Sequence, residues 1–151
     1  MYIGLISDTH GVFSQEFKDF LEPVDQIWHA GDFGGGLSLA AEIADFKPLV
    51  GVAGNCDNHE LRFTHPLHRF FECEGLKVLM THVGGYPGRY DPRARKLIDT
   101  YRPDLFVCGH SHILKVMRDQ QRNMLVVNPG AAGIQGFHVV RTALRFHIDA
   151  G

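Results

Sequence analysis

The sequence predicts a mixed α/β fold in which two sheets pack against each other and helices cover the outside. Apolar, strand-like runs alternate with helix-like stretches in the first part of the chain, and hairpin signals dominate the later part. With 151 residues, 44% of them hydrophobic and 21% charged, the chain can bury a substantial core. No repeat, linker or low-complexity tract divides it, so residues 1–151 are expected to form one domain.

Three helices are expected. Apolar residues repeat at helical spacing within residues 14–21 and again within residues 38–46. A third helix begins at Asp91-Pro92, because aspartate is a good N-cap and proline fits the first helical position. Pro103 ends this helix, since proline cannot continue it.

The other elements are expected to be strands. Apolar runs that each precede a polar segment predict strands at residues 2–6, 26–28, 49–52, 76–80 and 105–108. Further strands are expected at residues 68–73, 113–118, 124–127 and 136–148, with turns at residues 74–75, 119–123 and 128–130.

Charge and cysteine content exclude some functions. The formal net charge of -2 argues against a surface built to hold long nucleic acid, but it permits a small phosphorylated substrate. No apolar run approaches the length of a membrane span. Cys56, Cys73 and Cys108 are an odd number without a CxxC pair, which favours free thiols in a reducing compartment. The first residues already form a strand and leave no room for a signal peptide, so we expect a cytoplasmic protein.

Metal-ligand residue types follow five of the predicted strands. They lie in the segments Asp8-Thr9-His10, Gly31-Asp32, Gly54-Asn55-Cys56-Asp57, Thr81-His82 and Gly109-His110-Ser111-His112. Residues two apart point the same way where the chain leaves a strand, so Asp8 and His10 can reach one ion, as can His110 and His112. Most of these segments, taken alone, are more typical of a solvated loop or turn. Five in series indicate a two-metal hydrolytic site at the strand ends.

The ligand types also narrow the choice of metal. A mixed nitrogen and oxygen set suits Mn, Fe, Zn or Ni rather than a thiolate-rich structural zinc. The set comprises Asp8, His10, Asp32, Asn55, His82, His110 and His112. The carboxylate of Asp32 can bridge two ions at a separation of ~3.5–4 Å, although a helix-capping role fits this residue equally well in isolation. The glycines at positions 34–36 form either a flexible loop or an approach for the substrate.

The order D-x-H, G-D, G-N-x-D, H and G-H-x-H resembles the calcineurin-like metallophosphoesterase family. The resemblance spans Asp8 to His112, and Asn128-Pro129-Gly130 also matches a common family segment. The short length and Cys56 resemble the small prokaryotic phosphodiesterase branch. This resemblance implies a two-sheet αββα sandwich with a binuclear site at the strand ends.

The resemblance also implies the ligand sets and the reaction. One ion would be held by Asp8, His10, Asp32 and His112, and the other by Asp32, Asn55, His82 and His110. Two divalent ions, Mn in first place and Ni, Fe or Zn as alternatives, would polarise the phosphoryl oxygens, and a hydroxide bridging them would attack phosphorus in line. The implied activity is hydrolysis of phosphoesters, diesters rather than monoesters, with Asn55, Asp57 and His82 as catalytic residues.

Cys56 departs from the family pattern. Larger phosphatases of the family carry at this place a histidine that protonates the leaving group. A thiol with a pKa near 8.5 is a poor replacement acid, so a small packed residue is a simpler interpretation than a catalytic thiol. We therefore expect substrates with good leaving groups, or a proton from water or from a histidine such as His59.

Two further residues and the assembly state are open. Arg89 lies in the loop after His82 and is a candidate to bind a phosphate oxygen or the second ester group, while a solvated loop arginine is the simpler interpretation. His29 is expected to stabilise the core or to support the ligands. Exposed aromatic residues would favour a homo-oligomer, but their exposure is not fixed by the sequence.

The alternative function is a scaffold. Some family members keep the fold, lose productive metal binding and serve as protein-interaction subunits, as the retromer scaffold subunit does. The seven filled ligand positions favour the enzyme, whereas Cys56 favours the scaffold.

Overall fold

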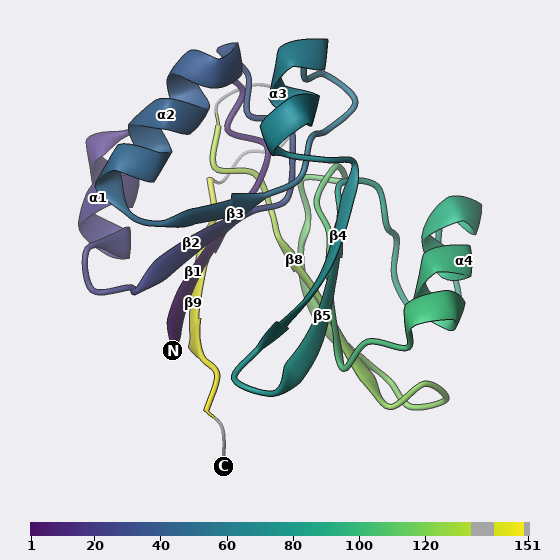
Figure 1. The fold of residues 1–151 in the computed structure, drawn as a ribbon. Coiled ribbons are helices and arrows are strands. Elements are labelled where there is room, and N and C mark those ends of the chain that lie inside the picture. Colours follow the sequence, from purple (N-terminus) through teal and green to yellow (C-terminus); the bar gives the residue numbers. More distant parts are fainter. Residues whose placement is uncertain (134–140, 150–151) are drawn as a thin grey trace.

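The computed structural model describes residues 1–133 and 141–149 and contains two sheets (Figure 1). The strands of the first sheet are ordered β3-β2-β1-β9. They are β1 (Tyr2–Ile6), β2 (Gln26–His29), β3 (Leu49–Gly51) and β9 (Leu144–His147). β2 pairs in parallel with both β1 and β3, so these three strands present their carboxyl ends at one edge. β9 is antiparallel to β1.

The second sheet has the strand order β4-β5-β6-β8-β7. Its strands are β4 (His68–Cys73), β5 (Leu76–Thr81), β6 (Leu105–Val107), β7 (Leu114–Asp119) and β8 (Met124–Pro129). β5, β6 and β8 run in parallel at the centre, while β4 and β7 are antiparallel edges. The carboxyl ends of β5 and β6 therefore also share one edge.

Helices cover the outer face of each sheet. α1 (Gln15–Leu21) and α2 (Gly36–Phe46) lie on the first sheet, and α4 (Pro92–Tyr101) lies on the second (Figure 1). Apolar clusters fill the three layers, under α1 and α2, between the sheets, and under α4. The expected two-sheet αββα sandwich is thus confirmed.

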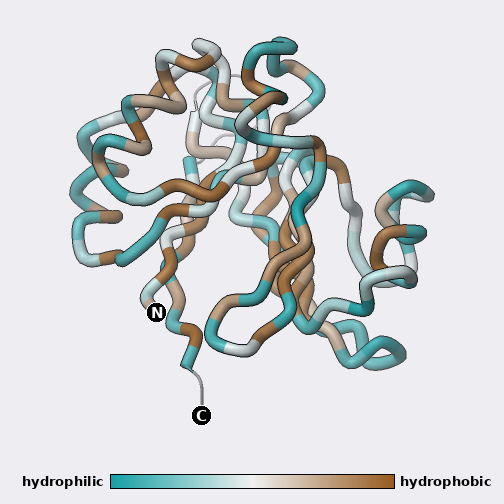
Figure 2. The backbone as a smooth tube through the Cα atoms, viewed as in Figure 1, coloured by the Kyte–Doolittle hydropathy of each residue, from teal (hydrophilic) through white to brown (hydrophobic). Residues whose placement is uncertain are grey.

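The alternation of side chains along β1 shows why the strand is buried on both faces. Ile3 and Leu5 pack between the two sheets, whereas Ile6 packs under the helices. Successive side chains of a strand point to opposite faces, so a continuous apolar run suits a strand covered on both sides. Figure 2 shows this hydrophobic character along the strands of both sheets, with hydrophilic residues at the end of the β7–β8 hairpin.

The third expected helix, α4, forms with the predicted start signals. The carboxylate of Asp91 accepts hydrogen bonds from the N–H groups of Arg93 and Ala94, at 3.1 and 3.2 Å. Pro92 occupies the first turn, and Ala94 and Ile98 face the second sheet. None of the helices in the described part of the chain is long and apolar enough to span a membrane.

Two expectations were wrong in detail. Residues 59–64 were not expected to be helical, yet they form α3 (His59–Thr64), a helix of 6 residues that buries only Leu61. The expected strand at residues 136–148 is shorter: β9 covers Leu144–His147, and residues 141–143 are not in a strand. Residues 136–140 of that expectation lie outside the described part.

Candidate metal centre

The predicted ligands converge where the carboxyl ends of the parallel strands of both sheets meet. Asp8 and His10 follow β1, Asp32 follows β2, and His82 follows β5. His110 and His112 follow β6. Hydrogen bonds join these loops across the two sheets, since the N–H of His110 donates to Asp8 Oδ2 at 3.1 Å and His82 Nδ1 contacts the carbonyl of Ala30 at 2.7 Å.

Six of the seven predicted ligands form two groups that are each able to hold a metal ion. Asp8, His10 and His112 form one group, and Asp32, His82 and His110 form the other. Within each group the ligand atoms lie within 4.8 Å of one another. The groups are adjacent, because Asp8 Oδ1 lies 3.8 Å from His82 Nε2, and Asp32 Oδ2 lies 3.1 Å from the same atom.

Three ligand atoms are buried without a hydrogen-bond partner. They are Asp8 Oδ1, His10 Nε2 and His82 Nε2. A buried polar atom without a partner costs roughly 1–3 kcal/mol, so such atoms are rare unless something else satisfies them. All three belong to the two groups, and their carboxylate and imidazole chemistry fits a divalent cation.

Hydrogen bonds on the far side of Asp8 and His82 aim their free atoms into the centre. Ser7 Oγ donates to Asp8 Oδ2 at 2.6 Å, which leaves Asp8 Oδ1 for a cation. The contact of His82 Nδ1 with the carbonyl of Ala30 requires a proton on Nδ1, because a carbonyl only accepts. In the neutral imidazole, Nε2 of His82 is then the unprotonated nitrogen, and it faces Asp8 and Asp32, as expected of a metal-binding histidine.

Asp32 and His82 each shift the pKa of the other. Burial acts to raise the pKa of Asp32, but His82 and the N–H of Cys56 outweigh it and lower this pKa to about 2. Burial acts to lower the pKa of His82, but Asp32 and Asp8 outweigh it and raise this pKa. Both shifts show that the carboxylates of Asp8 and Asp32 favour positive charge at this place, which suits a cation.

Five of the ligands have a left-handed backbone conformation. The φ angles are 53° at Asp8, 47° at His10, 56° at Asp32, 71° at His110 and 63° at His112. Among the described residues, only three other non-glycine residues have positive φ. Such conformations cost of order 1–3 kcal/mol each and concentrate at functional sites. The strained backbone marks this edge of the sandwich as built for ligand placement rather than for stability.

Glycines provide the space that the ligands need. A Cβ at Gly54 would overlap the carboxylate of Asp32. A Cβ at Gly109 would overlap Ser7 Oγ and lie 2.9 Å from Asp8 Oδ2. These two positions therefore require glycine for steric reasons, independent of backbone conformation.

Asn55 and its neighbours form a loop beside Asp32. Asn55 is exposed and lines a cavity together with His82. The N–H of Cys56 donates to Asp32 Oδ1 at 2.9 Å, and its thiol is exposed. Burial and the carboxylate of Asp32 raise the pKa of the Cys56 thiol, so the thiol stays protonated near neutral pH.

Asp57 binds backbone rather than another side chain. Its carboxylate accepts hydrogen bonds from the N–H groups of Phe33 and Gly34, both at 3.2 Å, and of Gly54 at 2.8 Å. The residue is 8% exposed. Asp57 therefore ties the loop that carries Asp32 to the loop that carries Asn55.

His29 supports the ligand loops from below. Its Nδ1 accepts the N–H of Gly31 at 3.1 Å, so its Nε2 carries the proton and donates to Thr9 Oγ1 at 3.0 Å. Thr9 in turn donates to the carbonyl of Phe33. Burial, with His82 and His65 nearby, lowers the pKa of His29, which keeps it neutral. The structure thus gives His29 the supporting role.

Two supporting residues were missed from the sequence. Ser7 binds Asp8, and Asn128 donates to the carbonyl of Gly109 at 2.9 Å, which holds the loop that carries His110. Asn128 also accepts the N–H of Gly130. The segment Asn128-Pro129-Gly130 was noted only as a family match and turn, and a buried polar residue at a strand end was the available signal.

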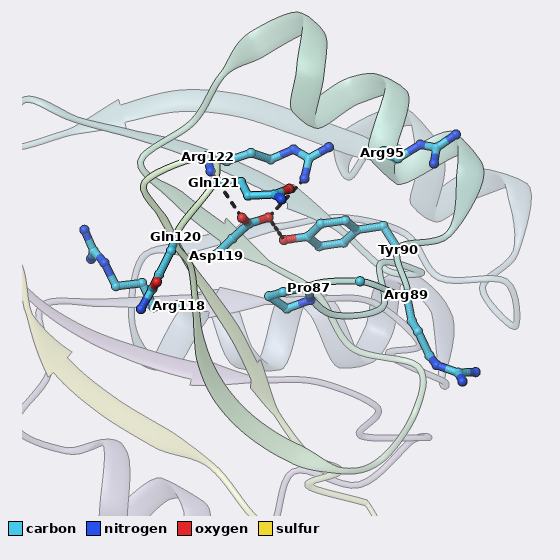
Figure 3. Close-up of a pocket in the computed structure, with 10 residues that line it drawn as sticks. Pro87, Arg89, Tyr90, Arg95, Arg118, Asp119, Gln120, Gln121 and Arg122 are labelled. Carbon is cyan, nitrogen blue, oxygen red and sulfur yellow. Dashed lines mark hydrogen bonds and ion pairs between the residues drawn. The ribbon is translucent and has the colours of Figure 1, made fainter.

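Arg89 lies near the centre but outside the ligand groups. It lines a cavity of about 320 Å³ together with His110 and Lys115. Its loop is fixed by Tyr90, whose hydroxyl donates to Asp119 at 2.8 Å, and Arg122 pairs with the same carboxylate at 3.2 Å. Figure 3 shows this arrangement, with the Arg89 side chain pointing away from Asp119.

The two-sheet sandwich carries two adjacent groups of metal-ligand residues at its strand ends, which is the arrangement of a candidate metal-binding site. The model of the calcineurin-like phosphoesterase superfamily domain matches residues 1–151. The chain belongs to this superfamily. No curated protein sequence matches the chain.

Several solved structures share the fold. Vps29 from Chaetomium thermophilum has a TM-score of 0.79 at 18% identity, covering 98% of this chain and 82% of that chain. Wild-type Vps29 complexed with Zn²⁺ from Entamoeba histolytica has a TM-score of 0.77 at 18% identity, covering 99% and 87%. A novel archaeal phosphodiesterase has a TM-score of 0.66 at 23% identity, covering 87% and 85%. At these identities the similarity establishes the fold.

Proposed function

We propose that residues 1–151 form one binuclear metal-dependent phosphodiesterase domain. The observation that carries the proposal is the pair of adjacent ligand groups, in which Asp8 Oδ1, His10 Nε2 and His82 Nε2 are buried without a hydrogen-bond partner. Buried ligand atoms without a hydrogen-bond partner are free to bind cations. Two adjacent metal sites suit the transfer of a phosphoryl group.

The ligand assignment follows the two groups. One ion would be held by Asp8, His10 and His112, and the other by Asp32, His82 and His110. The family resemblance adds Asp32 to the first set and Asn55 to the second. When bound, two divalent ions supply Lewis-acid polarisation of the phosphoryl oxygens and a hydroxide nucleophile near neutral pH. We propose Mn²⁺ first, with Ni²⁺, Fe²⁺ and Zn²⁺ as alternatives, because the donor set is mixed nitrogen and oxygen.

The chain's own residues position the substrate. Asn55 orients a phosphoryl oxygen from the cavity that it shares with His82. Asp57 holds the Asn55 loop against the Asp32 loop through its three backbone hydrogen bonds, which is a positioning role within the catalytic set. Arg89 binds a non-bridging oxygen or the second ester group, because it shares a cavity with His110.

Cys56 favours diesters with good leaving groups. The raised pKa of its thiol makes it a weak acid, so it does not protonate a departing alkoxide efficiently. A leaving group of low pKa needs no such acid. The similarity in fold to an archaeal phosphodiesterase is consistent with this preference.

Metal-restored hydrolysis tests the proposal. Metal-stripped protein would be supplied with Mn²⁺, Ni²⁺ or Zn²⁺ and assayed with an activated aryl phosphodiester beside the matching monoester. Asp32→Asn should abolish diester cleavage, whereas Asp45→Asn, at an exposed carboxylate on α2, should not change it. If the folded protein bound metal but hydrolysed neither substrate with any of the ions, the proposed enzymatic function would be refuted.

A scaffold is the second candidate function. The observation that favours it is Cys56 at the place of the family's proton-donating histidine, which weakens catalysis without affecting the fold. Refutation of the enzyme in the assay above would favour the scaffold. For either function we propose a cytoplasmic location, because all three cysteines are free thiols.

A further inference from the structure

A cavity of about 860 Å³ opens beside the candidate metal centre. His82 and Asn55 lie in its lining on the side of the centre. Leu67, Val83 and Leu97 line it as well, from the loop before β4, the loop after β5 and α4 respectively. The cavity is therefore continuous with the place where the phosphoryl group would bind.

The apolar lining is unusually exposed for side chains of this size. Leu67 is 45% exposed and Val83 is 37% exposed. Single exposed apolar residues are ordinary on a protein surface. Here residues from three separate elements converge on one cavity that includes a candidate metal ligand, which is the character of a ligand pocket.

The charged lining of the cavity is mainly cationic. Arg62 and Arg93 line it, and the Nε of Arg62 is buried without a hydrogen-bond partner. The one carboxylate in the lining is Asp91, whose Oδ2 accepts the N–H groups of Arg93 and Ala94 at the start of α4. A cationic group would be repelled here, whereas a neutral or anionic group with an acceptor atom would be accommodated.

We propose that this cavity binds one ester group of the substrate, and that this group is an apolar ring without positive charge. The inference rests on the proposed phosphoesterase function and specifies its substrate class as phosphodiesters with one such arm. The arm packs on Leu67, Val83 and Leu97 while its phosphoryl group lies at His82 and Asn55. The other ester group points toward the cavity of Arg89 and Lys115, which meets this one at Val83 and Asp91.

Equilibrium binding to the Mn²⁺-loaded protein tests the proposal without turnover. The probes are 1-naphthylmethylphosphonate and methylphosphonate, which share the phosphonate and differ in the apolar arm, and whose C–P bonds resist hydrolysis. Calorimetry should show the naphthyl probe binding at least about tenfold more tightly, since apolar contacts in a pocket give selectivity of this order.

Leu67→Ser should weaken the naphthyl probe by roughly fivefold to tenfold and leave methylphosphonate unchanged. The unchanged methylphosphonate affinity reports that the metal centre is intact. Leu125→Ser is the matched control, because Leu125 is 38% exposed and lies on β8, in a different cavity. It should affect neither probe.

Four results would overturn the inference. Equal affinity for both probes, in a protein that hydrolyses diesters, would agree with the proposed function but contradict the inference that the cavity binds an apolar ester group. Equal effects of Leu67→Ser and Leu125→Ser would place the arm elsewhere. A protein that binds neither probe and hydrolyses no ester would overturn the proposed function and this inference together. Phosphocholine carries a positively charged arm. If it bound more tightly than the naphthyl probe, the claim that the cavity excludes a positively charged group would be wrong.

Discussion

Asp57→Ala removes a carboxylate that accepts three backbone hydrogen bonds around the candidate metal centre. The donors are the N–H groups of Phe33 and Gly34, both at 3.2 Å, and of Gly54 at 2.8 Å. Alanine leaves these groups without an acceptor at a position that is 8% exposed. The loops that carry Asp32 and Asn55 would then lose the contact that holds them together.

The size of the effect follows from these bonds. Hydrogen bonds to a charged group contribute about 1.5–3 kcal/mol each, and the two at 3.2 Å are at the long end of the normal range. We therefore expect the free energy of unfolding to fall by about 3–5 kcal/mol. This is a large part of the roughly 5–15 kcal/mol typical of a domain.

Urea unfolding of the metal-free protein measures this loss without a contribution from bound ions. The midpoint should fall by about 2 M at unchanged slope, given slopes of about 1–3 kcal/mol per molar urea. Asp25→Ala is the control, because Asp25 is exposed and accepts one backbone N–H, from Tyr2 at 2.7 Å. A midpoint shift for Asp57→Ala no larger than that of Asp25→Ala would refute the reasoning.

Three further predictions follow from the site and its supports. Gly54→Ala should weaken metal binding by about 10–100-fold, because its Cβ would displace the Asp32 carboxylate; calorimetric titration with Mn²⁺ checks this. Burial and the hydrogen bond to Asp119 raise the pKa of Tyr90 in the folded protein. The contribution of Tyr90 to the free energy of unfolding is therefore complete below its unfolded-state pKa of about 10, and it is lost as the pH rises through the folded-state pKa. Tyr90→Phe should therefore lose less stability than wild type between about pH 9 and 11 in thermal unfolding. Cys56→His should raise kcat for esters with poor leaving groups by about tenfold or more, with little effect on activated aryl esters, in steady-state kinetics.

Each of these predictions has a control on the same chain. Gly75→Ala meets no atom within 4 Å, so it should cost stability at its positive φ but leave metal affinity unchanged. Tyr86→Phe changes a tyrosine on the same loop as Tyr90. It should lose as much stability as wild type when the pH is raised. Cys56→Ser should not reproduce the gain of Cys56→His. Equal effects of a variant and its control would contradict the corresponding argument.

The sequence predicted the strands and the order of the ligands well because both depend on local patterns. Apolar runs produced β1, β2, β5 and β6 close to their expected bounds, and the ligand-type residues follow them directly. α3 was not predicted, because its 6 residues are too few to show apolar periodicity. The signal that could have found it is Asn58, whose side chain caps the helix by accepting the N–H of Leu61.

By itself the sequence determined which residues have metal-binding chemistry and at which strand ends they stand, because strand period and residue type are local properties. The tertiary structure alone decided how they meet. The division into two groups depends on parallel pairing within each sheet and on the packing of the sheets across His82 and Asp8. The loop contacts of Asp57 arise only in that packing, and so does the clustering of five positive φ angles, since aspartate and histidine tolerate this conformation better than most residues but do not adopt it by default.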